Sequence, residues 1–429
     1  MRSLYRLAVS VAAPLHAATL ALRGRTAPGR RVTERFGFGA RIEGAPLWIH
    51  AASVGEVQLA ATVVRALRER CPALPILITA FTATGAARAG GLGLDLSVRY
   101  LPYDLPGPVR RFLDRARPRL AIILETELWP TLYRACHQRD VGLVVANARL
   151  SRRSARRYRR FGTLFRAALS GAHVAAQSAE DAERFRAIGA EPDRTRVIGN
   201  LKFDITLPPD IAVRGGCVRE RYAPDRPMWV AGSTHEGEDE RVIAAHDRIR
   251  ERLPGALLVL APRHPQRFDA VAARLAERNI PYVRHSRAAD HQRAGDARVV
   301  LLDTLGELLD FYAAADVAFV GGSLVPVGGH NLLEPAALGR PVATGPFVFN
   351  AAQVADILIE CGGARVVSDT ESLAACIGAW LQDAPERARV GGLGRAAVEA
   401  NRGALERLMA LIEPLLADAA RERHDMPEA

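Results

Sequence analysis

The sequence feature that most constrains the fold is a glycine-rich stretch between two short apolar runs. Residues 315–320 (ADVAFV) are typical of a buried parallel strand, and four glycines within 321–329 allow the backbone to turn sharply. Asn331 then caps a predicted helix over 332–338, and an apolar run starts the next strand. This order of strand, glycine loop, helix and strand predicts an α/β sheet that binds phosphate where the loop meets the helix N-terminus.

Three further features of this half also follow predicted strands or helix starts. Arg263 lies between two prolines after the strand 256–260, so it is rigidly held and suited to bind a phosphate. Residues 303–307 (DTLGE) form a turn and helix start whose amides can contact a base or a phosphate. Glu334, three residues after Asn331, has two compatible interpretations: a capping-box partner, or a carboxylate that accepts hydrogen bonds from the ribose of a nucleotide.

The first half of the chain repeats this plan with acidic side chains. Glu56 starts a predicted helix after the strand 46–50, so it either only offsets the helix dipole or takes a proton from a substrate hydroxyl. Glu125 follows the strand 120–124 in the motif ETELWP, at the sheet rim where we expect a carboxylate to face a cleft. Lys202 is either a surface lysine or, as its polar neighbours favour, a residue of that cleft.

The composition is that of a folded protein with room for two domains. Its 429 residues are 49% hydrophobic and 24% charged, which excludes wholesale disorder. Lys and Arg outnumber Asp and Glu by 58 to 47, and the net charge of +11 favours an anionic partner: nucleic acid, a phospholipid surface or a phosphorylated substrate. The five cysteines show no CxxC spacing, so we expect neither a zinc site nor a disulfide framework, as in a reducing cytoplasm.

The motifs divide the chain into two Rossmann-like halves. We expect their strand-end rims to face each other across a cleft, as in the GT-B fold of nucleotide-sugar transferases. In chain order the predicted segments are 1–25, a membrane-anchoring segment; 26–206, the N-terminal Rossmann-like domain; 207–226, a proline-containing linker; 227–415, the C-terminal Rossmann-like domain; and 416–429, a polar tail.

Two segments indicate contact with a membrane. Residues 7–22 are mostly apolar and flanked by arginines, but they fall short of the roughly 20 residues of a span. No convincing cleavage site follows, so we favour an anchor, either a marginal span or an interfacial helix, over a helix packed on its own domain. Residues 151–160 carry six arginines, and interleaved aromatic residues favour an amphipathic helix on an anionic membrane. A solvated helix face is the plainer alternative, and nucleic acid ranks last because no nucleic-acid-binding signature accompanies the run.

Taken together, the motifs resemble those of the Kdo transferases, which move 3-deoxy-D-manno-oct-2-ulosonic acid (Kdo) from CMP-Kdo onto lipid A precursors. The resemblance runs from about residue 22 to residue 400. Its blocks are WIHAASVGE (48–56), YLPYDLP (100–106), ETELWP (125–130), NARLS (147–151), GNLKFD (199–204), GSTHEGE (232–238), PRHPQR (262–267), DTLGEL (303–308) and GGSLVPVGGHNLLEPA (321–336).

The resemblance implies an inverting glycosyltransferase that uses lipid IVA as acceptor. It implies that Glu56 is the base that deprotonates the acceptor hydroxyl, and that Glu125 and Lys202 stabilise the transition state. It also implies association with the cytoplasmic side of the inner membrane. The residues that it implies contact the CMP moiety are Pro262, Arg263, Leu305, Gly306, Glu307, Asn331, Leu332, Leu333 and Glu334.

No Asp-x-Asp pair follows a predicted strand, so we expect an in-line displacement that needs neither a metal nor another cofactor. Two alternatives remain open. One is another two-domain transferase or epimerase with the same fold that uses a UDP-sugar. The other is a basic peripheral membrane protein that binds acidic lipid without turnover.

Overall fold

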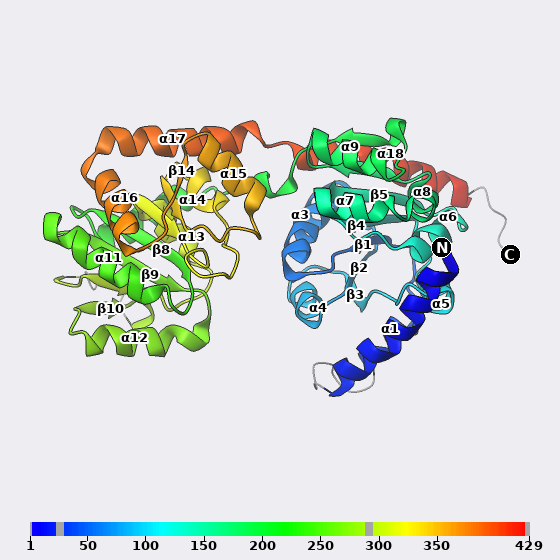
Figure 1. Cartoon of the computed structure of the whole chain (residues 1–429), viewed down its shortest axis with the longest axis horizontal. Helices are drawn as coiled ribbons and strands as arrows, with labels where there is room; N and C mark the ends of the chain where they lie inside the picture. The colour runs from blue at the N-terminus through cyan, green and yellow to red at the C-terminus, as the bar shows by residue number, and fades with distance from the viewer. Residues whose placement is uncertain (1, 23–29, 288–294, 425–429) are drawn as a thin grey trace. The chain divides into compact units, whose positions relative to one another are not determined.

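The computed structural model describes residues 2–22, 30–287 and 295–424. The chain folds into two compact units (Figure 1). The first comprises Met1–Asp204 together with Arg402–Ala429, and the second comprises Ile205–Asn401. The chain therefore passes between the units twice, once after Asp204 and once after Asn401.

The first unit is built on a parallel sheet in the order β3-β2-β1-β4-β5-β6-β7. Its strands are β1 Leu47–His50, β2 Ile76–Ala80, β3 Ser97–Tyr100, β4 Leu120–Leu124, β5 Gly142–Ala148, β6 His173–Ala176 and β7 Thr195–Val197. Every residue of β1, β2 and β4 is buried, as expected for strands that helices cover on both faces. The strand order reverses between β1 and β4, and open α/β sheets bind their ligands at such a switch point.

Helices cover both faces of this sheet. They are α2 Arg30–Arg35, α3 Val54–Arg70, α4 Ala83–Gly90, α5 Pro106–Ala116, α6 Pro130–His137, α7 Arg152–Arg159, α8 Gly162–Leu169, α9 Ala179–Ala187 and α18 Ala404–His424, with the short 3-10 turns η1 Pro192–Arg194 and η2 Leu201–Phe203. One core joins α3 and α18 to the sheet, and a second joins α5, α6, α8 and α9 to its other face.

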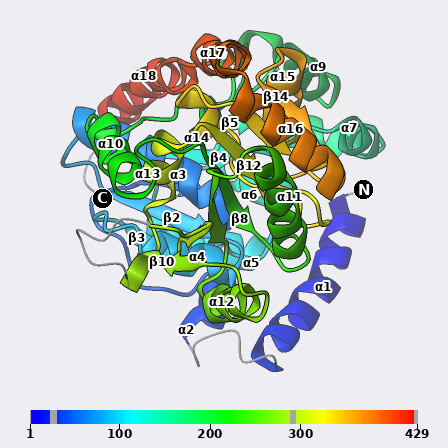
Figure 2. The same cartoon turned by 90° about the vertical axis from the view of Figure 1, so that its left-hand side faces the viewer.

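The second unit repeats the architecture with the strand order β10-β11-β9-β8-β12-β13-β14. Its strands are β8 Met228–Thr234, β9 Leu257–Pro262, β10 Tyr282–Arg284, β11 Val299–Leu301, β12 Val317–Val320, β13 Val342–Thr344 and β14 Ala364–Val366. Its helices are α10 Ile211–Tyr222, α11 Asp239–Arg252, α12 Phe268–Glu277, α13 Leu308–Ala314, α14 Leu333–Ala337, α15 Ala352–Glu360, α16 Thr370–Gln382 and α17 Ala384–Ala400, with the 3-10 turns η3 Pro265–Arg267 and η4 His285–Arg287. Here the order reverses between β8 and β12, which lie side by side in Figure 2.

The segment 207–226, predicted to be a linker, is instead part of the second unit. It contains α10, which packs against α13. Arg214 pairs with Asp310, and Arg219 Nη1 lies 2.9 Å from Asp316 Oδ2. These ion pairs and the helix–helix contact make α10 a folded element of that domain.

The C-terminal boundaries also differ from the prediction. Residues 402–415, expected in the second domain, and the described part of the predicted tail 416–429 form α18, which belongs to the first unit. The carboxylate of Asp204 accepts hydrogen bonds from the backbone N–H groups of Gly403 and Leu405, both at 2.6 Å. The start of α18 is therefore fixed directly to the end of the first unit's chain.

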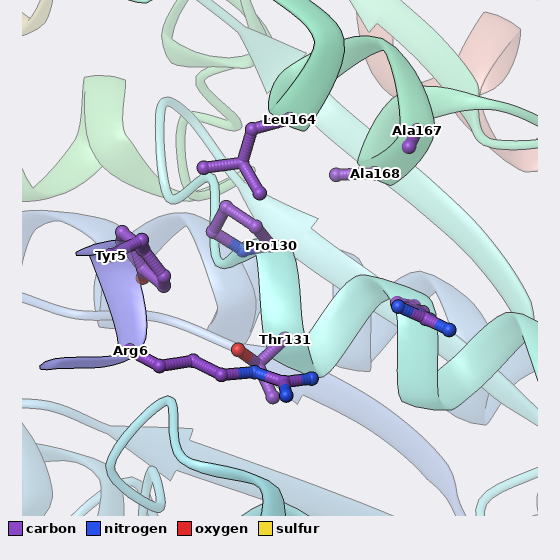
Figure 3. A pocket seen from close by; sticks show the side chains of 8 residues that line it. Tyr5, Arg6, Pro130, Thr131, Leu164, Ala167 and Ala168 are labelled. Atoms are coloured by element: carbon purple, nitrogen blue, oxygen red, sulfur yellow. The ribbon is translucent and has the colours of Figure 1, made fainter. Parts of the chain in front are cut away.

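The N-terminal helix α1 (Arg2–Leu22) contacts its own unit at one side and exposes apolar side chains at another. Tyr5 Oη donates a 2.7 Å hydrogen bond to the buried carboxylate of Asp104, and the His16 ring stacks on Phe81. A small pocket between α1, α6 and α8 is lined by Tyr5 and Arg6 and by residues of those two helices (Figure 3). Leu7, Val11 and Leu15 are each more than half exposed. No helix in the described part of the chain is long and apolar enough to cross a membrane. A membrane-anchoring segment over 1–25 is therefore not confirmed, and residues 1 and 23–25 lie outside the described ranges.

Candidate functional site

In the first unit, the switch point of the sheet presents Glu56. This residue lies in the first turn of α3, directly after β1. Ser53 Oγ donates to Glu56 Oε1 at 2.9 Å, and the backbone N–H of Ala52 donates to Glu56 Oε2 at 2.7 Å. The Glu56 N–H in turn donates to Ser53 Oγ, the N-cap side chain of α3, at 3.4 Å. The carboxylate accepts the N–H of Ala52 and not that of the N-cap Ser53, so the contacts differ from a capping box. These contacts and a catalytic role are compatible, because each carboxylate oxygen keeps a further lone pair.

The surroundings of Glu56 raise its pKa above the ordinary value. Burial is the main cause, and the negative charge of Glu125 adds to it. The N–H of Ala52, the Ser53 hydroxyl and His50 act in the opposite direction. A carboxylate with a raised pKa is a better proton acceptor near neutral pH than an ordinary surface glutamate.

The structure brings Glu125 and Lys202 together at the same rim. Lys202 Nζ lies 3.6 Å from Glu125 Oε1. Glu125 follows β4 with a φ of 58°, a backbone conformation that costs energy in any residue with a side chain. Lys202 lies in η2, where Asn200 Oδ1 accepts its backbone N–H at 3.0 Å. The local backbone conformation therefore fixes the position of both residues at this rim.

Sequence reasoning missed three buried polar residues at this rim: His50, Asn147 and Gln177. His50 Nδ1 lies 2.9 Å from Thr79 Oγ1, and its Nε2 lies 3.8 Å from Glu127 Oε2. Within the described ranges, Asn147 Nδ2 and Gln177 Oε1 are buried without a hydrogen-bond partner, although polar groups at such depth are nearly always paired. The sequence could have indicated these residues, because each is a polar residue at or just after the carboxyl end of an apolar strand.

In the second unit, the predicted nucleotide-contacting residues follow β9, β11 and β12. Pro262 ends β9 and is buried, whereas Arg263 is exposed. Leu305 is 70% exposed, and Gly306 has a φ of 91°, a conformation that favours glycine. Glu307 Oε1 lies 3.3 Å from His285 Nε2, an ion pair when that ring is protonated.

The loop from Asn331 to Glu334 is also ordered by its own side chains. Asn331 Oδ1 accepts from the N–H of Leu333 at 3.1 Å, and its Nδ2 donates to Glu334 Oε1 at 3.0 Å. The helix α14 begins at Leu333, one residue later than predicted, with buried Leu332 at its N-cap. Because the Asn331–Glu334 contact joins two side chains, it differs from the expected capping box. Burial raises the pKa of Glu334.

Three amides of the glycine loop, those of residues 322–324, donate to the carboxylate of Glu238. This carboxylate is fully buried. Its Oε2 accepts from Gly322 N at 2.6 Å and from His235 N at 2.9 Å. Its Oε1 accepts from the N–H groups of Ser323 and Leu324 at 2.9 and 2.8 Å. Those loop amides are therefore occupied, so the groups that neutralise a bound phosphate must come from elsewhere in the site.

No group of three or more His, Cys, Asp or Glu side chains suited to hold a metal ion occurs among the residues that the structure describes.

We predict that Glu238→Gln destabilises the second unit. The amide presents N–H groups where the carboxylate presented lone pairs, so donors of the loop lose their acceptor, at a cost of about 3 kcal/mol. Urea unfolding checks this. Glu236→Gln, an exposed neighbour, is the matched control and should change stability by no more than about 0.5 kcal/mol. Equal stability of the two variants would show that Glu238 does not hold the loop.

Sequence comparisons with known proteins point to one family. A family model described as 3-deoxy-D-manno-octulosonic-acid transferase (kdotransferase) matches residues 30–205. A 3-deoxy-D-manno-octulosonic acid transferase of Haemophilus influenzae is 38% identical over 90% of this chain and 92% of its own length. One of Bordetella pertussis is 39% identical over 97% of this chain and 99% of its own length.

Solved structures support the fold. The UDP-GlcNAc 2-epimerase from Neisseria meningitidis bound to UDP-GlcNAc has a TM-score of 0.58 at 11% identity, covering 86% of this chain and 100% of that chain. At such low identity the likeness concerns the fold alone, two parallel-sheet α/β units that resemble those of GT-B glycosyltransferases. The identity to the two bacterial transferases decides the family: the chain belongs to the 3-deoxy-D-manno-octulosonic acid (Kdo) transferases, glycosyltransferases of lipopolysaccharide biosynthesis.

Proposed function

We propose that this chain is an inverting transferase that moves Kdo from CMP-Kdo onto a lipid A precursor, lipid IVA, with Glu56 as the general base. The observation that carries the proposal is the state of Glu56. In a chain of this family, a half-buried carboxylate with a raised pKa lies at the switch point of the first sheet, beside Glu125.

The first unit supplies the acceptor chemistry. The Glu56 carboxylate accepts the proton of the acceptor hydroxyl as that oxygen attacks the anomeric carbon of Kdo, and the bond to the CMP phosphate breaks on the opposite side of that carbon. Lys202 and Glu125 form an ion pair at the same rim, and their charges stabilise the charge that shifts during the displacement. Positioning and general-base assistance provide most of the acceleration, and neither a metal nor a cofactor is required.

The second unit supplies the donor site. Arg263 is exposed beside the carboxyl end of β9 and offsets the phosphate charge of CMP. The segments Leu305–Glu307 and Asn331–Glu334 complete the site. There Glu334 accepts hydrogen bonds from ribose hydroxyls, with one of its oxygens already fixed by Asn331.

We expect Glu56→Gln to abolish Kdo transfer while CMP binding survives, because the amide keeps the size of the side chain but cannot accept the proton. Loss of general-base assistance costs about 10²–10⁴ in rate. In the wild type, the rate should fall as the pH drops through the pKa of Glu56, which lies above that of an ordinary glutamate. Transfer is measured by mass spectrometry of lipid IVA incubated with a CMP-Kdo generating system.

Glu69→Gln, an exposed change on the same helix α3, is the matched control and should leave the rate unaltered. Undiminished transfer by Glu56→Gln would rule out the assignment of the base. A lipid-binding protein without turnover would instead show no transfer in the wild type or in any variant.

The donor assignment predicts that CMP protects the protein against thermal unfolding and that UMP does not. A ligand at about 100 times its Kd adds about 2.7 kcal/mol of stability, which is easily resolved in a melting experiment. Arg263→Ala should remove most of the protection by CMP but not lower the melting temperature of the free protein, because the side chain is exposed. Stronger protection by UMP would favour the alternative of a UDP-sugar enzyme.

We further propose that the protein works on the cytoplasmic side of the inner membrane, with α1 lying in the interface. The exposed Leu7, Val11 and Leu15 support this, since a four-residue spacing aligns them along one face of the helix. The six arginines of 152–160 around α7 offer charge complementarity to acidic lipid.

Vesicle sedimentation tests the membrane proposal. Binding to vesicles that contain anionic lipid should exceed binding to neutral vesicles. The double variant Arg156→Gln/Arg160→Gln should weaken binding about thirtyfold, at about 1 kcal/mol per charge. The same change at Arg252 and Arg278, two exposed arginines of the second unit, is the control. Equal losses in both double variants would mean that net charge, and not α7, governs the attraction.

A further inference from the structure

Two histidines of the second unit form a close pair. Their rings take part neither in the hydrogen bonds around Glu238 nor in the predicted site. His235 follows β8, and His330 lies at the end of the glycine loop that follows the adjacent strand β12. Their Nε2 atoms lie 2.8 Å apart, and the ring planes are parallel to within 8°, with centroids 5.0 Å apart. His264, after β9, meets the His235 ring edge-on with centroids 5.2 Å apart. The three imidazoles thus come from the carboxyl ends of three neighbouring strands, at the switch point of this sheet.

The distance between the two Nε2 atoms fixes how many protons the pair can hold. At 2.8 Å one nitrogen carries the hydrogen and the other accepts it, so both cannot be protonated at once. In the neutral pair, one ring is the Nε2–H tautomer and its partner the Nδ1–H tautomer. One further proton can add, at Nδ1 of the donating ring. The pair then carries a single positive charge and presents an N–H group at both Nδ1 atoms.

The charged groups around the pair favour its neutral form while no anion is bound. Arg263, His264 and Arg267 contribute or can contribute positive charge. Of the two acidic groups, Glu238 attracts a proton to His235 but is occupied by four backbone N–H groups, and Asp239 pairs with Arg267. Burial first, and then these cations, lower the pKa of His235 and bring that of His330 down to about 4.

An anion beside the pair would reverse this balance. The N–H groups of Gly322, Ser323 and Leu324 are taken by Glu238, and those of Gly328 and Gly329 by the Gly322 carbonyl. The loop therefore offers few amides to a phosphate. Arg263 is a single cation, and a second one at this rim can come from the histidine pair.

We propose that the His235–His330 pair contacts the phosphate of the donor nucleotide and takes up one proton from solvent as the nucleotide binds. The inference rests on the proposed donor site and adds to it a residue pair and a proton. After uptake, the two Nδ1–H groups donate to phosphate oxygens. By linkage, affinity for the nucleotide falls as the pH rises, by up to about tenfold per pH unit where uptake is complete.

Calorimetry of the full-length protein tests the inference. The probe is the methyl ester of CMP, because its phosphate keeps one charge, as in a CMP-sugar, whereas free CMP has a phosphate pKa of about 6 that would itself take up protons. Titrations at about pH 7 in buffers of low and high ionisation enthalpy give the number of protons bound. We expect each bound ester to take up a measurable fraction of one proton. We expect no uptake with cytidine, which lacks the phosphate.

Variants assign the proton to the pair. His330→Gln and His235→Gln should each abolish the uptake and flatten the dependence of the Kd on pH. His173→Gln is the matched control, because His173 lies in the first unit and its pKa is likewise lowered by burial and nearby arginines. It should leave the uptake unchanged.

The outcomes separate the two proposals. Tight binding of the ester by the wild type with equal heats in both buffers would overturn the inference and leave the donor site intact. Undiminished uptake in both pair variants would overturn it as well. Failure of the wild type to bind either the ester or CMP would overturn the proposed donor site, and with it the inference. The comparison of ester and cytidine needs no variant, so it decides even if a substitution impairs folding.

Discussion

The buried carboxylate of Glu238 is the interaction on which the second unit's site depends. A charge removed from water is tolerated only when it is fully hydrogen-bonded, and four backbone N–H groups meet that condition here. Because three of the donors belong to consecutive loop residues, the carboxylate fixes the path of the glycine loop. That path in turn determines the positions of His330 and Asn331. Glu238, which is not among the residues proposed to bind CMP, therefore positions two residues that are.

Glu56 is the counterpart in the first unit, and the contrast between the two glutamates explains how one turn serves two purposes. Each glutamate is the second residue of a Gly-Glu pair. The pair comes shortly after a strand at the switch point of its sheet, β1 for Glu56 and β8 for Glu238. Glu238 is fully buried and satisfied by backbone amides. Glu56 receives one amide and one hydroxyl, stays partly exposed, and lies near the negative charge of Glu125. Burial, as the main cause, and the like charge of Glu125 raise the pKa of Glu56 and make it suited to chemistry, whereas Glu238 is suited to support.

The strands and the motifs that follow them could be predicted from the sequence, because apolar runs and glycines report local structure directly. The boundary errors have physical causes. The three prolines that suggested a linker over 207–226 flank α10 rather than interrupt it, at Pro208, Pro209 and Pro224. The periodicity of α18 shows an apolar face but not which sheet that face covers. The partners of the loop amides were equally invisible, since Glu238 lies more than 80 residues away from them in the sequence.

The return of α18 to the first unit makes the second unit an insertion within a discontinuous domain. Leu408, Met409 and Ile412 are fully buried in the same core as Val57 and Leu124. A fragment that ends at residue 204 would therefore leave a long apolar groove open along the sheet and should aggregate when expressed alone. Splitting the protein into functional halves requires a peptide that supplies residues 402–424 in trans, or a rearranged gene in which a short turn joins Asp204 to Arg402.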